Sequence, residues 1–499
     1  MPKYSSADIL GLAPALVLIV GALTLLLLEV FQESEKRGYQ AWFTAIVAAI
    51  ASLVALPMLD GEAHRILLTQ DGLFFAVADR FGGAMAIVVA AGLALSALTA
   101  GAFLGARKAE RGEFYALAMF AASGMVLLAQ ATDLLMIFVA LEIMSISTYA
   151  LAAYLRRGMR TTEAAFKYFI LGAFSTALYI YGAALVYGAT GGQTGLQQVA
   201  EAASEGSLLL MAGVAFVAAG FFFKVAAAPF HMWTPDVYEG APTPVTAFMA
   251  AGVKAAAFAA LFRVFTVAFG SEDVALHGWM NVVVVLAILT MVVGNLLAIP
   301  QRSVKRLLAY SSIAHAGYLM AAIAAAANPE VRAAAGEGLL YYLATYTFAG
   351  IGAFAVVAAL ERQGAEGPLM WDLDRFAGLA RVRPALAMAM GLFLLSLAGI
   401  PPTAGFMGKL LIFRAAVDAK LYGLAIFGVL TSLVGVYYYL RVVVYMYMRE
   451  REPSVGELPA PRLAMGVALA LAAIGTLILG IVPGFFGEIA RASTLALGG

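Results

Sequence analysis

Long apolar stretches separated by short polar segments run through the whole chain. The first extends from about Ile9 to Val30, and it is longer than the core of a signal peptide, so we interpret it as a retained membrane span. A helix needs roughly 20 apolar residues to cross a bilayer, and the pattern therefore predicts about 14 spans. They begin near residues 8, 40, 80, 112, 133, 162, 206, 242, 275, 301, 334, 384, 419 and 461. The predicted fold is all-α, a polytopic membrane protein with about 14 transmembrane helices.

Proline interrupts two of these spans, the seventh at Pro229 and the twelfth at Pro401 and Pro402. Proline removes a helix hydrogen bond, and backbone freed at membrane depth must find partners in protein or water. Each break is fourth in a block of five spans, and a block with an odd number of spans is inverted when it repeats. We therefore predict two inverted five-helix repeats with broken helices 7 and 12. The predicted segments are an N-terminal three-helix segment with a hairpin (1–111), the repeats (112–270 and 271–450), and a last helix with a short tail (451–499).

Composition supports a membrane protein and narrows its chemistry. Hydrophobic residues make up 63% of the chain and charged residues 12%, far from soluble globular proteins. The absence of cysteine and the presence of only four histidines remove most ligands for iron–sulfur clusters, haem or metals. We expect no cofactor and no metal in this chain. A net charge of +1 without a basic run argues against nucleic acid and favours lipid and protein partners.

The loops predict an orientation. Lysine and arginine are roughly three times as frequent in the loops after odd-numbered spans as in the other loops and the termini, so the positive-inside rule places both termini outside. One outside loop, from His64 to Ala78, carries Asp71-Gly72 between two apolar runs. This pattern is typical of a β-hairpin that would suit docking to a neighbouring subunit, the alternative being an irregular loop.

Four charged side chains lie inside predicted spans: Glu142, Lys224, Lys254 and Lys409. A charge at the centre of a bilayer costs at least about 2.5 to 3.5 kcal/mol, so such residues usually line a buried path for ions. Because burial disfavours a charged lysine and a nearby carboxylate favours it, a Glu–Lys pair whose separation changes acts as a proton switch. If Glu142 faces Lys224, a proton can pass from Lys224 to Lys254 and then to Lys409, with water bridging the gaps. The alternatives are a carboxylate that only joins helices and lysines that only cap carbonyls freed at the breaks.

Several further residues are secondary relay candidates: Lys167, His231, His315 and Tyr310. Lys167 is close enough to the interface to reach water instead, and either histidine can be a packing residue. Tyr310 and His315 belong to a polar seam that can hold water or join helices. We interpret Arg263 and Arg441, near the ends of their spans, as anchors.

The motifs around these residues resemble one family. The segments 133–142, 162–173, 231–246 and 305–318, together with the Lys224 and Lys254 pair and the double proline before Lys409, are similar to the antiporter-like proton-pumping membrane subunits of respiratory complex I (NADH:quinone oxidoreductase). Relatives of these subunits occur in multi-subunit cation/proton antiporters. The resemblance covers nearly the whole chain.

The resemblance implies a fold with inverted repeats and a division of roles. Glu142 and Lys224 would form a controlling pair, Lys254 a central relay, and Lys409 the terminal site. It also implies a subunit of a translocase in the bacterial inner (cytoplasmic) membrane, with sister antiporter-like subunits as partners and with FMN, iron–sulfur clusters, NADH and quinone bound by partner subunits. Two alternatives stay open, a subunit of a cation/proton antiporter and a scaffold whose buried charges only fix helix packing.

Overall fold

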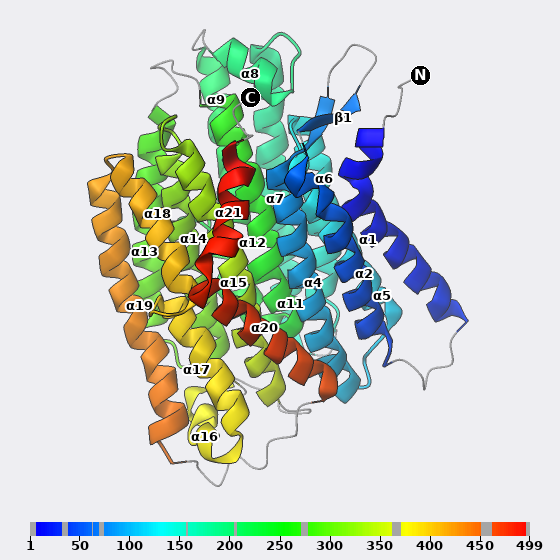
Figure 1. The fold of residues 1–499 in the computed structure, drawn as a ribbon, viewed down its shortest axis with the longest axis vertical. Helices are drawn as coiled ribbons and strands as arrows, with labels where there is room; N and C mark the ends of the chain where they lie inside the picture. The colour runs from blue at the N-terminus through cyan, green and yellow to red at the C-terminus, as the bar shows by residue number, and fades with distance from the viewer. Residues whose placement is uncertain are drawn as a thin grey trace.

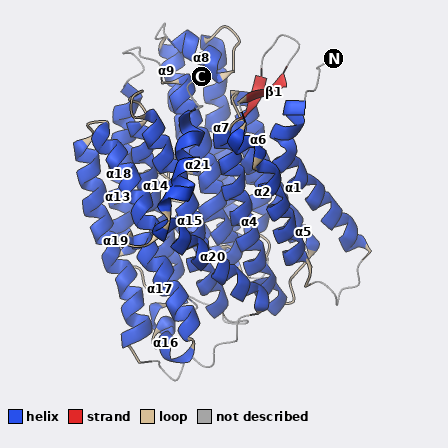
Figure 2. Cartoon of the chain, viewed as in Figure 1, coloured by secondary structure: helices blue, strands red, loops and turns tan. Residues whose placement is uncertain are grey.

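The computed structural model describes residues 6–31, 38–61, 63–68, 74–155, 158–203, 207–270, 278–361, 371–450 and 462–495. It is a bundle of long, nearly parallel helices with one small hairpin at one end (Figures 1 and 2). We call this end the hairpin end. The start of α1 and the last helix, α21, also lie toward it.

The N-terminal part contains three long helices and the hairpin. Its elements are α1 (Ser6–Val30), α2 (Gln40–Ala55), α3 (Pro57–Asp60), β1 (His64–Leu68), β2 (Phe74–Ala78) and α4 (Arg80–Ala106). The strands pair antiparallel with His64 opposite Ala78, which confirms the predicted hairpin, while Asp71-Gly72 lies outside the described residues.

The first predicted repeat begins with α5 (Gly112–Gln130), α6 (Leu134–Ala152), α7 (Met159–Ala189) and α8 (Leu196–Ala203). A broken helix follows, formed by α9 (Leu208–Lys224) and α10 (Thr234–Gly240). The last span runs from Thr243 to Ala268 and consists of α11 (Thr243–Phe248), the π-turn η1 (Met249–Val253), α12 (Lys254–Arg263) and the π-turn η2 (Val264–Ala268). We call this span the Lys254 helix.

The second predicted repeat contains α13 (Gly278–Ala298), α14 (Val304–Ala325) and α15 (Arg332–Leu360), then the short helices η4 (Leu373–Phe376) and α16 (Leu379–Val382). Its broken helix is α17 (Pro384–Ala398) with α18 (Ala404–Asp418), and α19 (Tyr422–Met448) follows. The chain continues with α20 (Leu463–Ile481) and α21 (Pro483–Leu495). In both blocks the first two helices pack together and the third packs along the broken one.

The span count agrees with the prediction. Within the described residues, 12 helices are long and apolar enough to cross a membrane, and α9 and α17 are shorter apolar helices. Each of these two is continued by a second piece after its proline, so the twelve and the two broken helices make the expected set of about 14. The Ala228–Pro229 and Pro401–Pro402 peptide bonds at the breaks are cis.

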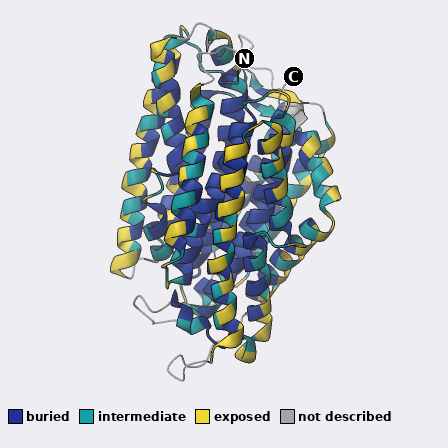
Figure 3. Cartoon of the chain, turned by 90° about the vertical axis from the view of Figure 1, so that its left-hand side faces the viewer, coloured by how far each residue is buried: buried dark blue, intermediate teal, exposed yellow. Residues whose placement is uncertain are grey.

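Polar caps start several spans at the predicted places. Asp79 accepts a hydrogen bond from the Gly82 amide at the start of α4, and Asp133 does the same for Leu135 at the start of α6. Such caps satisfy amides that have no partner inside the helix. Exposed positions form stripes along the outer helices while the interior is buried (Figure 3). Many of the exposed residues are large and hydrophobic, as expected where lipid covers the outside.

Candidate functional site

The four charged residues lie on four different spans. Glu142 is at the middle of α6, Lys224 ends α9, Lys254 begins α12 and Lys409 is in α18. The three lysines are only 5%, 2% and 7% exposed, whereas Glu142 is half-buried. Buried ammonium groups need hydrogen-bond partners, and the nature of these partners differs from one lysine to the next.

Lys224 binds side-chain hydroxyls. Its ammonium group donates to Ser145 Oγ at 2.8 Å and to Tyr149 Oη at 3.1 Å. Glu142 accepts from the Thr176 hydroxyl at 2.8 Å. Ser145 and Tyr149 follow Glu142 on α6 by three and seven residues, so all three share one helix face.

Glu142 and Lys224 lie near each other without an ion pair. No Glu142–Lys224 ion pair within 4.0 Å occurs among the described residues, although the two groups interact electrostatically. The Lys224 ammonium group is hydrogen-bonded to Ser145 and Tyr149 instead.

A series of aromatic rings lies between Lys224 and Lys254. The Tyr149 ring meets Tyr168 edge-on at 4.7 Å, and Tyr168 stacks on Trp233 at 4.9 Å between ring centroids. Trp233 in turn meets Tyr238 at 6.0 Å, and the Tyr238 hydroxyl approaches the Ser312 hydroxyl. This connection has hydroxyl groups at its two ends and an indole in its middle.

Polar side chains gather near Lys254 and Lys409. Lys254 donates to both the carbonyl and the hydroxyl oxygen of Ser312 on α14. One turn further on α14, the two ring nitrogens of His315 bind the hydroxyls of Tyr342 and Tyr439. His315 interacts electrostatically with both lysines, so it lies near both of them.

Lys409 binds backbone as well as a hydroxyl. Its ammonium group donates to the carbonyls of Leu397 at 3.0 Å and Ala398 at 2.9 Å, and to Ser432 Oγ at 2.7 Å. The two carbonyls end α17, where the helix break leaves them without helical partners. Lys409 therefore caps carbonyls freed at a helix break, which was the alternative to a relay role for both Lys224 and Lys409. Lys224 does not cap such carbonyls.

The secondary candidates lie in different surroundings. Lys167 is 38% exposed and pairs with Glu163 at 2.6 Å and Asp236 at 2.8 Å. His231 follows the first break, and its Nδ1 is buried without a hydrogen-bond partner among the described residues. Tyr310 is half-buried on α14. Of this set, only His315 bonds to groups near two of the buried lysines.

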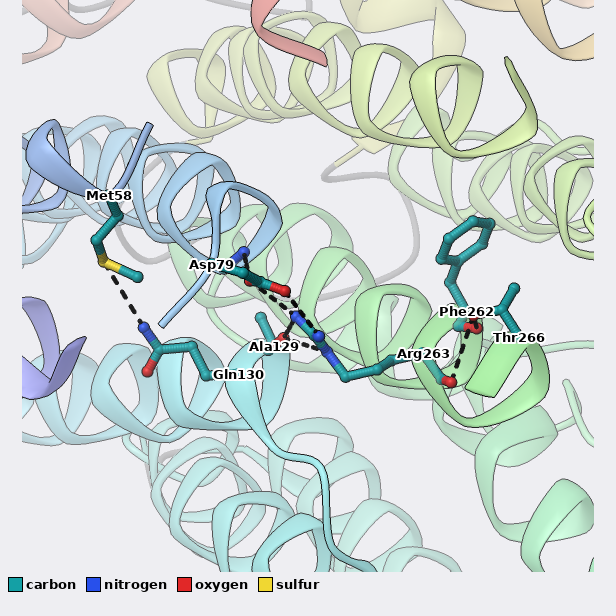
Figure 4. Close-up of polar contacts among 8 residues, drawn as sticks. Met58, Asp79, Ala129, Gln130, Phe262, Arg263 and Thr266 are labelled. Atoms are coloured by element: carbon teal, nitrogen blue, oxygen red, sulfur yellow. Dashed lines mark hydrogen bonds and ion pairs between the residues drawn. The ribbon is translucent and has the colours of Figure 1, made fainter. Parts of the chain in front are cut away.

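The interpretation of Arg263 as an anchor is wrong. Its side chain is 3% exposed and forms an ion pair with Asp79, which is 2% exposed. Nη1 and Nη2 donate to the two carboxylate oxygens at 2.9 and 3.1 Å, and Nη2 also donates to the Ala129 carbonyl at 3.0 Å (Figure 4). No short motif joins positions 79 and 263, so the sequence carried no signal for this pair. Arg441 does bind a helix end, donating to the carbonyls of Ile299 and Gln301.

The described residues of the site provide no set of metal ligands. The sequence has no cysteine, and the described residues contain no cluster of three or more His, Asp or Glu that could hold an ion. The arrangement consists of lysines, hydroxyls and one histidine, which can exchange protons.

Comparisons with known proteins identify relatives over the whole chain. Residues 131–435 match the family model described as NADH:quinone oxidoreductase/Mrp antiporter, TM. A protein of Myxococcus xanthus (strain DK1622) named NADH-quinone oxidoreductase subunit N is 52% identical over 99% of this chain and 99% of its own length. A protein of the same name from Trichlorobacter lovleyi is 43% identical over 98% of this chain and 97% of its own length.

Two solved structures share the fold. A chain of respiratory complex I from Thermus thermophilus with bound aureothin has a TM-score of 0.78 and 36% identity, covering 96% of this chain and all of that one. A chain of the Mrp complex from Dietzia sp. DQ12-45-1b has a TM-score of 0.85 but 23% identity, covering 98% of this chain and 97% of that one. The likeness to the Mrp chain, at 23% identity, shows the fold alone. The Mrp chain has the higher TM-score but the lower identity, so sequence identity and not the TM-score separates the complex I chain from the Mrp chain.

Proposed function

Because this chain belongs to the subunit N family of NADH-quinone oxidoreductase, respiratory complex I, we propose that it moves protons across the membrane through a buried relay of glutamate, lysine and water. The relay comprises Glu142, Lys224, Lys254 and Lys409, with His315 between the last two. Quinone reduction in other subunits drives it. This chain supplies no redox centre.

The observation that carries the proposal is the series of polar side chains near Lys254 and Lys409. Ser312 accepts a hydrogen bond from the Lys254 ammonium group, and His315 binds two tyrosine hydroxyls. The Tyr318 ring lies 5.1 Å from the Lys409 nitrogen. A buried lysine that only stabilised packing would need a fixed acceptor and no chain of groups that both donate and accept. Serine, tyrosine and histidine can do both.

Lys224 would exchange protons with Lys254 less readily. Trp233 stands between Tyr168 and Tyr238 in that connection, and an indole N–H only donates. Its N–H is already bonded to the Phe223 carbonyl at 3.1 Å. Proton transfer between Lys224 and Lys254 would require water or a side-chain rearrangement. Loosening of the Glu142–Lys224 pair would act at this step.

The test is Lys254→Met in the assembled complex. Vesicles with the NADH site outward are energised with NADH, and proton uptake is measured with a pH-sensitive dye beside NADH oxidation and complex content. We expect K254M to assemble and to pump fewer protons per NADH. Lys420→Met, at an exposed lysine after α18, is the control and should pump as the parent does.

The outcomes separate the three function classes. Unchanged pumping by K254M would exclude the relay. Failure of K254M to assemble would favour a scaffold role for the buried charges. Sodium-dependent transport without NADH would favour an antiporter, which stays a second candidate because the matching family model covers Mrp antiporters as well.

The remaining expectations form part of the same proposal. We place the chain in the bacterial inner membrane with both termini outside, as a neighbour of sister antiporter-like subunits. Lys167, His231 and Tyr310 would serve proton entry or hydration, and Pro229, Pro401 and Pro402 would keep the helix breaks open. The segments 112–270 and 271–450 would be the two inverted repeats.

A further inference from the structure

The Lys254 helix is fully buried yet has few features of its own that fix its position along its axis. Its central part, Ala255–Phe262, contains only alanine, phenylalanine and leucine. Two π-turns interrupt it, η1 directly before Lys254 and η2 directly after Arg263. Five of these eight residues are alanines, whose small side chains allow close packing. The polar contacts at the two ends of the helix are therefore candidates for setting the height of Lys254.

At the hairpin end, Arg263 ties the Lys254 helix to two other helix ends. Asp79 is the N-cap of α4 and binds both terminal nitrogens of the guanidinium group. The Ala129 carbonyl, in the last turn of α5, accepts from Nε and Nη2. Figure 4 shows Asp79 and Ala129 facing the guanidinium group from two different helices. Such a two-pronged contact fixes direction as well as distance.

At the opposite end, Glu361 ties the start of the same helix to the other end of α4. Its side chain is 8% exposed and accepts from Arg107 at 3.0 Å and from Thr243, the first residue of the Lys254 helix. Trp371 Nε1 donates to the same carboxylate at 3.2 Å. Arg107 is the C-cap of α4.

Both ties therefore join the Lys254 helix to α4, which is not part of either predicted repeat. Asp79 precedes α4 and Arg107 follows it, and these signs agree with the helix dipole of α4. A helix of 27 residues is about 40 Å long, enough to cross the bilayer. α4 also packs along α11, η1 and α12.

The tie at the hairpin end is set apart from the proposed relay. A cavity of about 130 Å³ lies beside Asp79 and Arg263 and is also lined by Arg65, Thr132 and Gln198. Between it and Lys254 lies the segment Ala255–Phe262, which has no polar side chain. Stability alone also explains them poorly, since neutral residues of similar shape often replace a buried ion pair without loss.

We propose that α4 is a splint for the Lys254 helix, and that Asp79, Arg263, Arg107 and Glu361 are positioning residues that hold Lys254 level with Ser312. This inference rests on the proposed function. The π-turn η1 lies between the two ties while η2 lies beyond Arg263, so a change of winding at η1 between fixed ends would rotate Lys254 rather than displace the whole helix.

The experiment uses the assembled complex and paired neutral substitutions. D79N/R263Q removes both charges at the hairpin end, and R107Q/E361Q does so at the other end, so neither variant leaves one member of its ion pair charged without the other. We expect both to assemble and oxidise NADH at the parental rate, with the proton-to-NADH ratio reduced by at least roughly half of the decrease that K254M causes, since small misplacements of a reacting group have large effects. R302Q/D372N, an ion pair that contacts neither helix, is the matched control and should keep the parental ratio.

The outcomes distinguish this inference from the proposed function. If K254M loses pumping while D79N/R263Q and R107Q/E361Q keep the parental ratio, the splint is excluded and the relay stands. If K254M pumps normally, the relay itself is excluded. Should D79N/R263Q not assemble, R263K keeps the charge but has fewer donors for Ala129. It should then assemble with a reduced ratio, and a parental ratio would overturn the splint.

Discussion

Gly405→Ala tests how closely the two halves of the second broken helix must approach. Gly405 lies in the first turn of α18, and a Cβ there would stand 1.9 Å from the Ser396 carbonyl oxygen of α17. A non-bonded carbon and oxygen keep about 3.3 Å apart, so the two halves would have to separate by about 1.4 Å. Lys409 is four residues further on α18 and moves with it. Its hydrogen bonds to Leu397 and Ala398 would therefore be stretched or lost.

Overpacking of this kind typically costs about 1 to 3 kcal/mol. We expect G405A to lower the melting temperature of the purified complex and to reduce NADH-driven proton uptake more than NADH oxidation. Both are measured on membranes with matched complex content. The obstacle is backbone rather than a flexible side chain, so a rotamer change cannot relieve it.

Gly391→Ala is the matched control, because a Cβ at Gly391 in α17 meets nothing within 4 Å. It should be neutral or slightly stabilising, since alanine is about 0.5 to 1 kcal/mol better than glycine inside a helix. If G405A melts and pumps like G391A, the reasoning about close approach at the break is refuted.

Two further predictions concern groups at the edge of the relay and outside the membrane. Thr176→Val removes the hydroxyl bonded to Glu142. A hydrogen bond to a charged acceptor is worth about 1.5 to 3 kcal/mol, so pumping should slow in T176V but not in T176S. Equal pumping rates in the two variants would argue against a role for Glu142. Burial raises the pKa of Asp372, but the hydrogen bonds from Arg302 and Asp374 together with the Arg302 charge outweigh burial and hold that pKa below its usual value. The stability that this pair supplies is therefore present above about pH 4 and lost as the pH falls through the lowered pKa. Arg302→Gln should lower the melting temperature at pH 7 and at about pH 4 alike, with a difference that narrows only below about pH 4; a difference that stays constant below about pH 4 would contradict this assignment.

The sequence predicted most of the architecture because the bilayer imposes a strong length rule. Span number, both helix breaks and the hairpin strands follow from apolar run lengths, prolines and a turn signal. The burial of Lys224, Lys254 and Lys409 also agrees with the prediction that they are buried charges inside spans. These are properties of single segments, which a linear pattern can reveal.

Contacts between distant segments could not be predicted in the same way. Arg263 was interpreted as an anchor from its distance to the span end, but its partner Asp79 lies 184 positions away. The partners of Lys224 are likewise set by how α9 packs against α6. A residue's depth can be counted along a helix, whereas its partner depends on which helix faces it.

The two broken helices hold their lysines by different chemistry, and this difference bears on how the proposed relay would work. Among the described residues, Lys224, which precedes its break, binds the hydroxyls of Ser145 and Tyr149, which can accept a proton and pass it on. Lys409 follows its break and binds two carbonyls, which accept hydrogen bonds but cannot donate. Its exchangeable partner in the described part of the chain is Ser432. Within the proposed relay, a proton at Lys224 has two side-chain routes while a proton at Lys409 has one, so equivalent positions in the two predicted repeats need not perform equivalent steps.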